Sequence, residues 1–193
     1  MAKRVYFAFH YQDVIDFRAN VVRNHSFVGG VEKAGYFDAS IWEKARNTNP
    51  LALKRLINSE LEYTSVTVVL IGTGTWARPW VRYEILKSMK RGNKLLGVHI
   101  NGIPGKDKQT KNLGPNPFDF LAYRYNNSGS SLTMLEHNNG AWSEYSEIDG
   151  SATYQLENSK PKQGGQAFKL SNDYPVYLWN RDNGYENFAT WIE

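Results

Sequence analysis

The sequence predicts an α/β fold in which helices flank a central parallel sheet and a β-rich appendage follows at the C-terminal end. Short apolar runs alternate with amphipathic segments up to about residue 100. Elements in this order form βαβ units, whose strands are parallel and whose crossovers are right-handed. After residue 101 the composition changes to loop-forming residues and then to aromatic, β-rich runs. This change indicates a second structural unit.

Four runs in the first half are candidates for buried strands. The strongest is SVTVVLIG at 65–72, which is β-branched and bounded by glycine. RVYFAF at 4–9 and KLLGVHI at 94–100 are also short and apolar. GYFDAS at 35–40 is weaker because it ends in polar residues. A four-stranded core is therefore expected.

Three helices are expected between these strands. Asp13 is the expected N-cap of the first, in which one face carries the apolar residues Val14, Phe17, Val21 and Val22. Asn49 and Pro50 are typical of a helix start, with the asparagine as N-cap and the proline at the first helical position. A third amphipathic helix follows the strand at 65–72 and ends at Gly92.

The C-terminal part is expected to be mostly β-structure. Residues 101–117 have the composition of a loop. Residues 132–148 contain two β-rich runs around Asn-Asn-Gly, which is typical of a hairpin. Residues 174–193 indicate a strand followed by a short helix. We therefore divide the chain into a core domain at 1–123 and an appendage at 124–193, packed on the core.

Composition excludes several classes of function. The 193 residues contain no cysteine, so disulfides, thiolate catalysis and zinc–thiolate sites are ruled out. No apolar run approaches the ~18 residues of a membrane span, and we expect a cytoplasmic protein without a membrane partner. The formal charge of +4 comes from scattered basic residues, with a solvated loop at 105–111, so no nucleic acid is expected. The histidines lack metal-ligand spacing, and no metal is expected.

Residues that could carry chemistry gather where the predicted strands end. In a doubly wound sheet, ligands bind outside the carboxyl ends of the strands. The first strand brings Phe9, His10 and Tyr11 to this edge, and the second brings Asp38. The third brings the loop from Gly72 to Trp76, and the helix that carries Trp80 and Glu84 begins after that loop.

Each of these residues also has an ordinary structural reading. Glu84 could form a surface pair with Lys87, and Trp80 could be a core residue. His10 could be a general base or a hydrogen-bonded residue at a strand end. Asp38 could accept a hydrogen bond from a ribose hydroxyl or cap a turn.

The stretch GTGTWA at 72–77 formally matches a dinucleotide-binding loop. That reading is rejected, because the loop follows the third strand and its tryptophan crowds the turn. No acidic residue lies at the position expected for a ribose contact.

Several segments together resemble a known family. WVRYEI at 80–85 is similar to the TIR signature in which a tryptophan precedes a glutamate by four residues. With FHYQD at 9–13, FDASIWE at 37–43 and GPNPFDFLAY at 114–123, it resembles the TIR protein of the bacterial Thoeris anti-phage system. The resemblance implies a flavodoxin-like TIR fold with Glu84 as the catalytic residue. It places the substrate-binding pocket at five residues: Phe9, His10, Tyr11, Asp38 and Trp76.

The resemblance also implies a reaction. Such enzymes cleave NAD, release nicotinamide and close ADP-ribose into a cyclic isomer that activates a separate effector protein. NAD is the substrate, and no cofactor is expected. The resemblance further suggests a homo-oligomer and leaves a phage component as a candidate trigger. The alternative is a TIR interaction module without catalytic activity.

Overall fold

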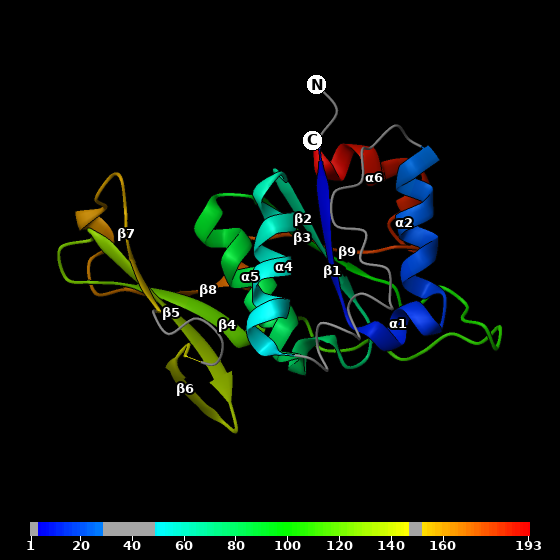
Figure 1. Cartoon of the computed structure of the whole chain (residues 1–193), viewed down its shortest axis with the longest axis horizontal. Coiled ribbons are helices and arrows are strands. Elements are labelled where there is room, and N and C mark those ends of the chain that lie inside the picture. Colours follow the sequence, from blue (N-terminus) through cyan, green and yellow to red (C-terminus); the bar gives the residue numbers. More distant parts are fainter. Residues whose placement is uncertain (1–3, 29–48, 147–151) are drawn as a thin grey trace.

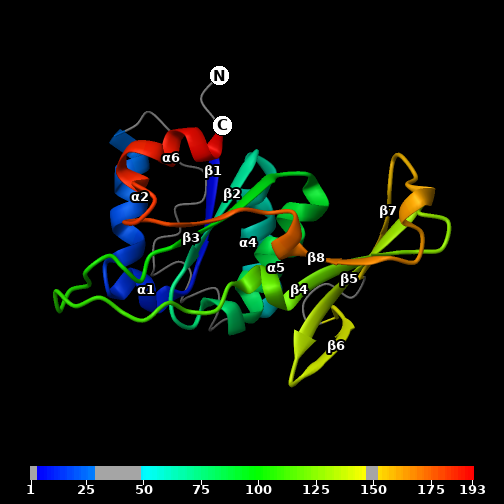
Figure 2. The same ribbon diagram turned by 180° about the vertical axis from the view of Figure 1, so that it is seen from behind.

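The structure of the chain is a computed structural model that describes residues 4–28, 49–146 and 152–193. Within these ranges a parallel sheet with helices on both faces lies beside a separate antiparallel sheet (Figure 1). Figure 2 shows from behind that the chain crosses to the second sheet and returns, so that its C-terminal helix lies near the start of the first strand. This arrangement confirms the predicted α/β fold.

The parallel sheet has the strand order β1-β2-β3-β9. Its strands are β1 (Val5–Phe9), β2 (Val66–Ile71), β3 (Lys94–His99) and β9 (Val176–Leu178). The first three match the runs predicted at 4–9, 65–72 and 94–100. The candidate strand at 35–40 lies outside the described residues.

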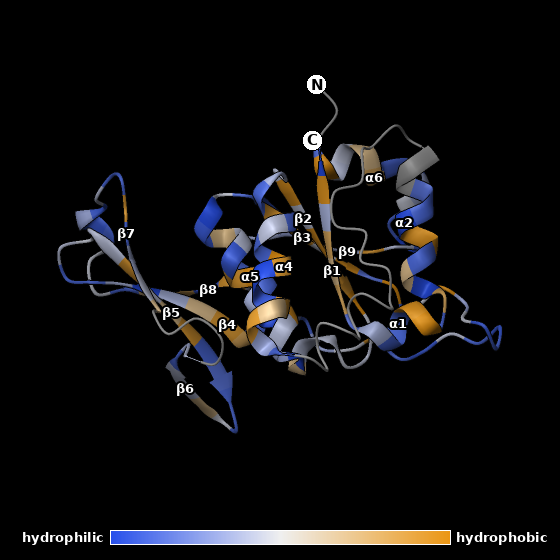
Figure 3. Cartoon of the chain, in the orientation of Figure 1, coloured by the Kyte–Doolittle hydropathy of each residue, from blue (hydrophilic) through white to orange (hydrophobic). Residues whose placement is uncertain are grey.

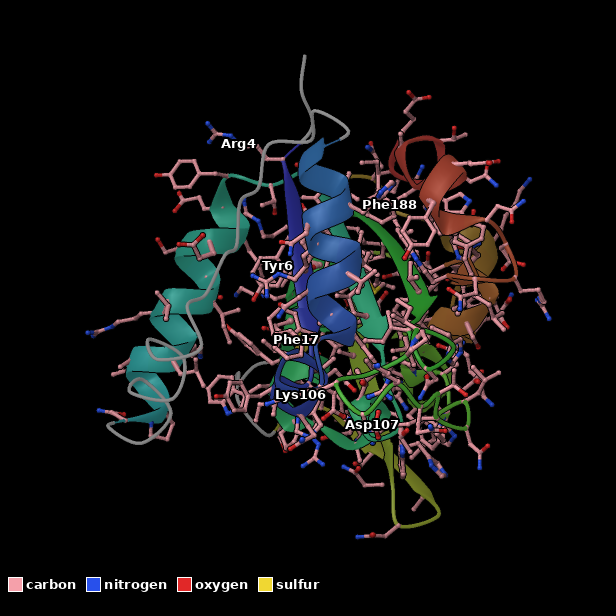
Figure 4. All side chains as sticks on the ribbon, turned by 90° about the vertical axis from the view of Figure 1, so that its right-hand side faces the viewer. Arg4, Tyr6, Phe17, Lys106, Asp107 and Phe188 are labelled. Carbon is pink, nitrogen blue, oxygen red and sulfur yellow. The ribbon has the colours of Figure 1, made fainter. Side chains whose placement is uncertain are left out.

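Strand residues alternate between two hydrophobic layers. Tyr6 and Ala8 of β1 pack into the layer under α4 (Pro50–Glu62) and α5 (Pro79–Arg91). Val5 and Phe7 pack into the opposite layer, together with the side chains of α2 (Arg18–Val28) and α6 (Gly184–Ile192). Tyr6 and Phe188, one residue from each layer, are labelled in Figure 4. Both faces of the sheet are thus covered, as its apolar strands require.

The first helical segment differs from the prediction. A short α1 (Tyr11–Ile15) precedes α2, and its N-cap residue is His10 rather than Asp13. Phe17 interrupts the helix with a φ of 64°, and its side chain is half-exposed instead of lying on the apolar face. Asp13 is buried inside α1. The cap assignment was wrong because the chain turns into the helix directly after β1.

The predicted start of the second helix and the predicted end of the third are confirmed. The side chain of Asn49 accepts a hydrogen bond from the Leu51 amide at 2.8 Å, and Pro50 opens α4. α5 ends at Gly92, whose φ of 77° closes the helix in the left-handed conformation.

The antiparallel sheet has the order β6-β5-β4-β8, with β7 paired to β5. Its strands are β4 (Leu121–Tyr125), β5 (Ser131–Asn138), β6 (Ala141–Glu144), β7 (Thr153–Gln155) and β8 (Ala167–Lys169). β5 and β6 form the predicted hairpin, and positive φ angles at Asn139 and Gly140 make its turn. Figure 3 shows more hydrophilic colour on this sheet than on β1.

Short 3-10 segments connect these elements. They are η1 (Thr75–Ala77), η2 (Pro117–Phe120), η3 (Pro161–Gln163) and η4 (Leu170–Asn172). The predicted strand and helix at 174–193 are confirmed as β9 and α6. Both belong to the parallel sheet and its helix layer, because β9 pairs with β3 and Trp191 lies in the core. The region predicted as an appendage therefore supplies part of the core.

Candidate active site

A pocket lies where β1 ends and α5 begins. The residues that line it are Phe9, His10, Tyr11, Arg78, Pro79, Trp80 and Val81, and it holds about 500 Å³ of empty space, part of it open to solvent. The structure thus brings the predicted residues Phe9, His10 and Tyr11 together with Trp80, whereas Glu84 is not among the residues that line this pocket. The pocket is at the carboxyl end of a parallel strand, where ligands bind in folds of this type.

Local geometry explains why α5 begins beside this pocket. η1 turns the chain after β2, and Pro79 opens the helix at its first position. Trp80 packs its ring edge-on against Tyr83, with the centroids 5.9 Å apart. Glu84 follows one helical turn after Trp80, on the part of α5 that faces the sheet.

Glu84 is buried, with 3% of its surface exposed, so the reading as a surface charge is wrong. The Tyr6 hydroxyl donates a hydrogen bond to Glu84 Oε1 at 2.6 Å. Oε2 has no hydrogen-bond partner among the described residues. Burial raises the pKa of Glu84 to about 8, although the Tyr6 hydrogen bond acts in the opposite direction. A buried carboxyl group with a raised pKa lowers the stability of the fold when it is ionised, and such a group is a recognised sign of a functional site.

Trp76 lies apart from the first pocket. Its ring packs on Phe120, with centroids 4.6 Å apart, and it lines a second pocket with Arg82 and the β5–β6 turn. This second pocket holds about 690 Å³ of empty space. Asp38 lies outside the described residues. The catalytic role of Glu84 and the substrate contacts of Phe9, His10, Tyr11, Asp38 and Trp76 stay predictions.

Asp13 is a buried acid that the sequence did not mark as part of the site. Only 4% of its surface is exposed, and burial raises its pKa to about 6. Thr75 Oγ1 lies 3.5 Å from its Oδ2 and accepts a hydrogen bond from the Gly72 amide at 2.8 Å. A Cβ atom at Gly72 would lie 2.2 Å from the Asp13 carboxylate oxygens, so only glycine fits there. The polar HYQD stretch after β1 was the available signal.

A third buried carboxyl group, on the antiparallel sheet, lies against α5. Glu136 of β5 forms an ion pair with Arg82 at 3.0 Å, and both residues are buried. Arg82 Nε also donates to the Trp76 carbonyl at 3.1 Å, and Nη1 contacts Asn138 Oδ1. Arg82 therefore joins the start of α5 to the second sheet. Its burial was not predictable, because its acidic partner is 54 positions away.

The described ranges contain no group of three or more His, Cys, Asp or Glu side chains suited to a metal ion. Among the same residues, no helix has both the length and the apolar character needed to cross a membrane.

Comparison with known proteins identifies the family. The sequence model of the Thoeris protein ThsB, TIR-like domain, matches residues 6–104, which hold most of β1, all of β2, β3 and α5, and the residues of the first pocket. The chain is also 50% identical to a protein of Bacillus cereus (strain MSX-D12) that is named as a candidate cyclic ADP-D-ribose synthase, ThsB1. That similarity covers 100% of both chains. The chain therefore belongs to the TIR-like family of Thoeris ThsB proteins.

Proposed function

We propose that the chain is an anti-phage defence enzyme that cleaves NAD, releases nicotinamide and cyclises the ADP-ribose. Full-length similarity to a protein named as a candidate cyclic ADP-D-ribose synthase supports this reaction. The observation that most supports Glu84 as its catalytic group is its buried carboxyl, in which one oxygen accepts a hydrogen bond and the other has no partner within the described part of the chain.

The chemistry suits such a carboxyl. Cleavage breaks the bond between C1′ of the ribose and the nicotinamide nitrogen and leaves positive charge on an oxocarbenium-like sugar. A carboxylate in a dry site stabilises that charge far more than it would in water. NAD already carries a positive pyridinium ring, which favours the ionised form of a nearby acid. Substrate binding would therefore offset the effect of burial on the pKa of Glu84.

Cyclisation needs a nucleophile within the ADP-ribose to reach C1′ before water does. The new bond forms between that nucleophile and C1′, and one proton is released. Holding the two ends of the substrate together gives this advantage. The aromatic rings of Phe9, Tyr11 and Trp80 line the first pocket, and such rings pack on flat bases while excluding water.

NAD is the substrate in this proposal, and no cofactor takes part. The cyclic product diffuses to a separate effector protein and activates it. We also propose a cytoplasmic homo-oligomer, with a phage component as the trigger. The flavodoxin-like core would serve equally in a TIR interaction module, so a test of activity has to separate the two.

The test uses bacteria that express the protein and are challenged with phage. Small molecules are extracted before and after challenge, and mass spectrometry searches for a species with the mass of cyclic ADP-ribose. Glu84→Gln keeps the shape of the side chain and removes its charge. Glu144→Gln removes the same charge at an exposed position of β6 and serves as the control.

We expect the species after challenge in the wild type and in Glu144→Gln, and at least 100-fold less of it in Glu84→Gln. Equal amounts in wild type and Glu84→Gln would contradict the catalytic assignment. Absence of the species from every strain, while the phage response continues, would support the interaction module instead.

A further inference from the structure

Tyr6 is the polar contact of Glu84 that the sequence did not predict. It is the second residue of β1, fully buried, and its hydroxyl lies 2.6 Å from Glu84 Oε1. A phenylalanine would fill the same apolar layer without placing a hydroxyl against a buried acid. Hydrophobic packing alone therefore does not explain why this residue carries a hydroxyl.

We infer that Tyr6 is a positioning residue for the Glu84 carboxyl, because it holds Oε1 while Oε2 has no hydrogen-bond partner among the described residues. The inference rests on the proposed function and assigns Tyr6 no contact with NAD. A fixed hydrogen bond limits rotation of the carboxyl about its terminal bond, which otherwise has broad torsional freedom. Hydrogen bonding to one oxygen also favours the ionised form.

The phenol is suited to act as a permanent donor. Burial, with the negative charge of Glu84 next in effect, raises the pKa of Tyr6 well above its usual value, so the hydroxyl keeps its proton. The titratable groups that act on Tyr6 are Glu84 and Tyr83 of α5 and Glu60 of α4. Burial first, and then these groups, favour the neutral phenol that donates the hydrogen bond.

The backbone at Glu84 is fixed by bonds that do not involve Tyr6. Ser88 Oγ donates to the Glu84 carbonyl at 2.7 Å and accepts from Thr67 Oγ1 of β2 at 2.8 Å. The Tyr83 hydroxyl donates to Asn58 Oδ1 of α4 at 2.7 Å. Loss of the Tyr6 hydroxyl should therefore disturb the carboxyl group and leave α5 in place.

Tyr83→Phe is the matched control for Tyr6→Phe. Each variant removes one phenol hydroxyl from a buried ring in the same hydrophobic layer, but only Tyr6 bonds to Glu84. The assay follows conversion of added NAD to cyclic ADP-ribose across a range of pH, in lysates of phage-challenged cells with equal amounts of each variant.

Tyr6→Phe should move the acidic limb of the pH–rate profile upward by about one to two pH units, the size of one hydrogen bond to a charged group. The rate should fall about tenfold or more at neutral pH and recover at alkaline pH. Tyr83→Phe should leave the midpoint where the wild type has it. An unshifted Tyr6→Phe profile, or an equal shift in both variants, would overturn the inference.

A second substitution covers the case in which Tyr6→Phe does not fold. Tyr6→3-fluorotyrosine keeps the hydroxyl and makes it a stronger donor, so the acidic limb should move downward; an unmoved limb would overturn the inference. Glu84→Gln separates this result from the proposed function. An inactive Glu84→Gln with an unshifted Tyr6→Phe removes the role of Tyr6 alone, whereas an active Glu84→Gln removes the catalytic assignment itself.

Discussion

Two buried carboxyl groups, one on α5 and one that packs against α5 from β5, have opposite surroundings. Glu84 faces β1 and meets a neutral phenol, while Glu136 of β5 meets the guanidinium of Arg82. Exposure does not distinguish them, because 3% of the surface of Glu84 is exposed and 4% of that of Glu136. The difference is the cation, which is present for Glu136 and replaced by a hydroxyl for Glu84.

This contrast distinguishes a buried carboxyl group that has a structural role from one that is available for chemistry. A buried acid with a cation is compensated and joins two parts of a fold. A buried acid with a neutral partner keeps an uncompensated position that a positively charged substrate can fill. Arg82 and Glu84 are two residues apart in WVRYE, yet Arg82 joins α5 to the antiparallel sheet through an ion pair, whereas Glu84 meets the parallel sheet through the neutral hydroxyl of Tyr6.

The largest expected effect concerns the compensated acid. Glu136→Ala leaves the Arg82 cation buried without its carboxylate, and the free energy of unfolding should fall by about 3–5 kcal/mol. Glu144→Ala is the control, because Glu144 pairs with Arg124 at the same 3.0 Å but at an exposed site. Its cost should stay below about 1 kcal/mol. Similar losses in denaturant unfolding of the two variants would contradict the distinction.

A somewhat smaller effect on the free energy of unfolding is expected at Glu84, where removal of the acid should stabilise the fold at alkaline pH instead of destabilising it. Burial raises the folded-state pKa from 4.5 to about 8, so the associated stability is complete below about pH 4.5 and is lost as the pH rises to about 8. Between pH 5 and pH 8 the wild type should lose about 3 kcal/mol that Glu84→Gln does not lose. Denaturant unfolding at both pH values measures this, and parallel pH dependence in the two proteins would contradict the raised pKa.

The smallest expected change in the free energy of unfolding is at Gly92, and it serves as a reference for the two effects that involve carboxyl groups. Gly92 ends α5 with a φ of 77°, and a Cβ there would meet nothing within 4 Å. Gly92→Ala should therefore cost about 1 kcal/mol through backbone strain alone. Because neither carboxyl is involved, the loss should be the same at pH 5 and pH 8. A loss that changes with pH would show that movement of α5 alone perturbs Glu84.

Local patterns were enough to predict the elements that depend on neighbouring residues. The apolar runs gave the first three described strands of the parallel sheet, and Asn49 with Pro50 located the start of α4. The Asn-Asn-Gly turn located the β5–β6 hairpin. Each of these depends on propensity and periodicity within a few residues, which a single sequence contains.

Contacts between distant segments were not predictable in the same way. The pattern at 174–193 indicates a strand, but nothing local says that it pairs with β3. The Tyr6–Glu84 bond spans 78 positions, and the burial of Asp13 depends on how the loop after β2 closes over it. For Glu84, position and resemblance singled out the residue, and only the fold revealed its partner.

The most direct test of the account is a titration of the Glu84 carboxyl itself. Protein labelled with ¹³C at the glutamate carboxyl carbons is followed by NMR across pH, and Glu84→Gln assigns the resonance by its absence. We expect one glutamate carboxyl with a midpoint near 8, and we expect this resonance to be missing from the variant. If the resonance that disappears in Glu84→Gln titrates near the ordinary value of 4.5, then Glu84 is not the uncompensated buried acid described here.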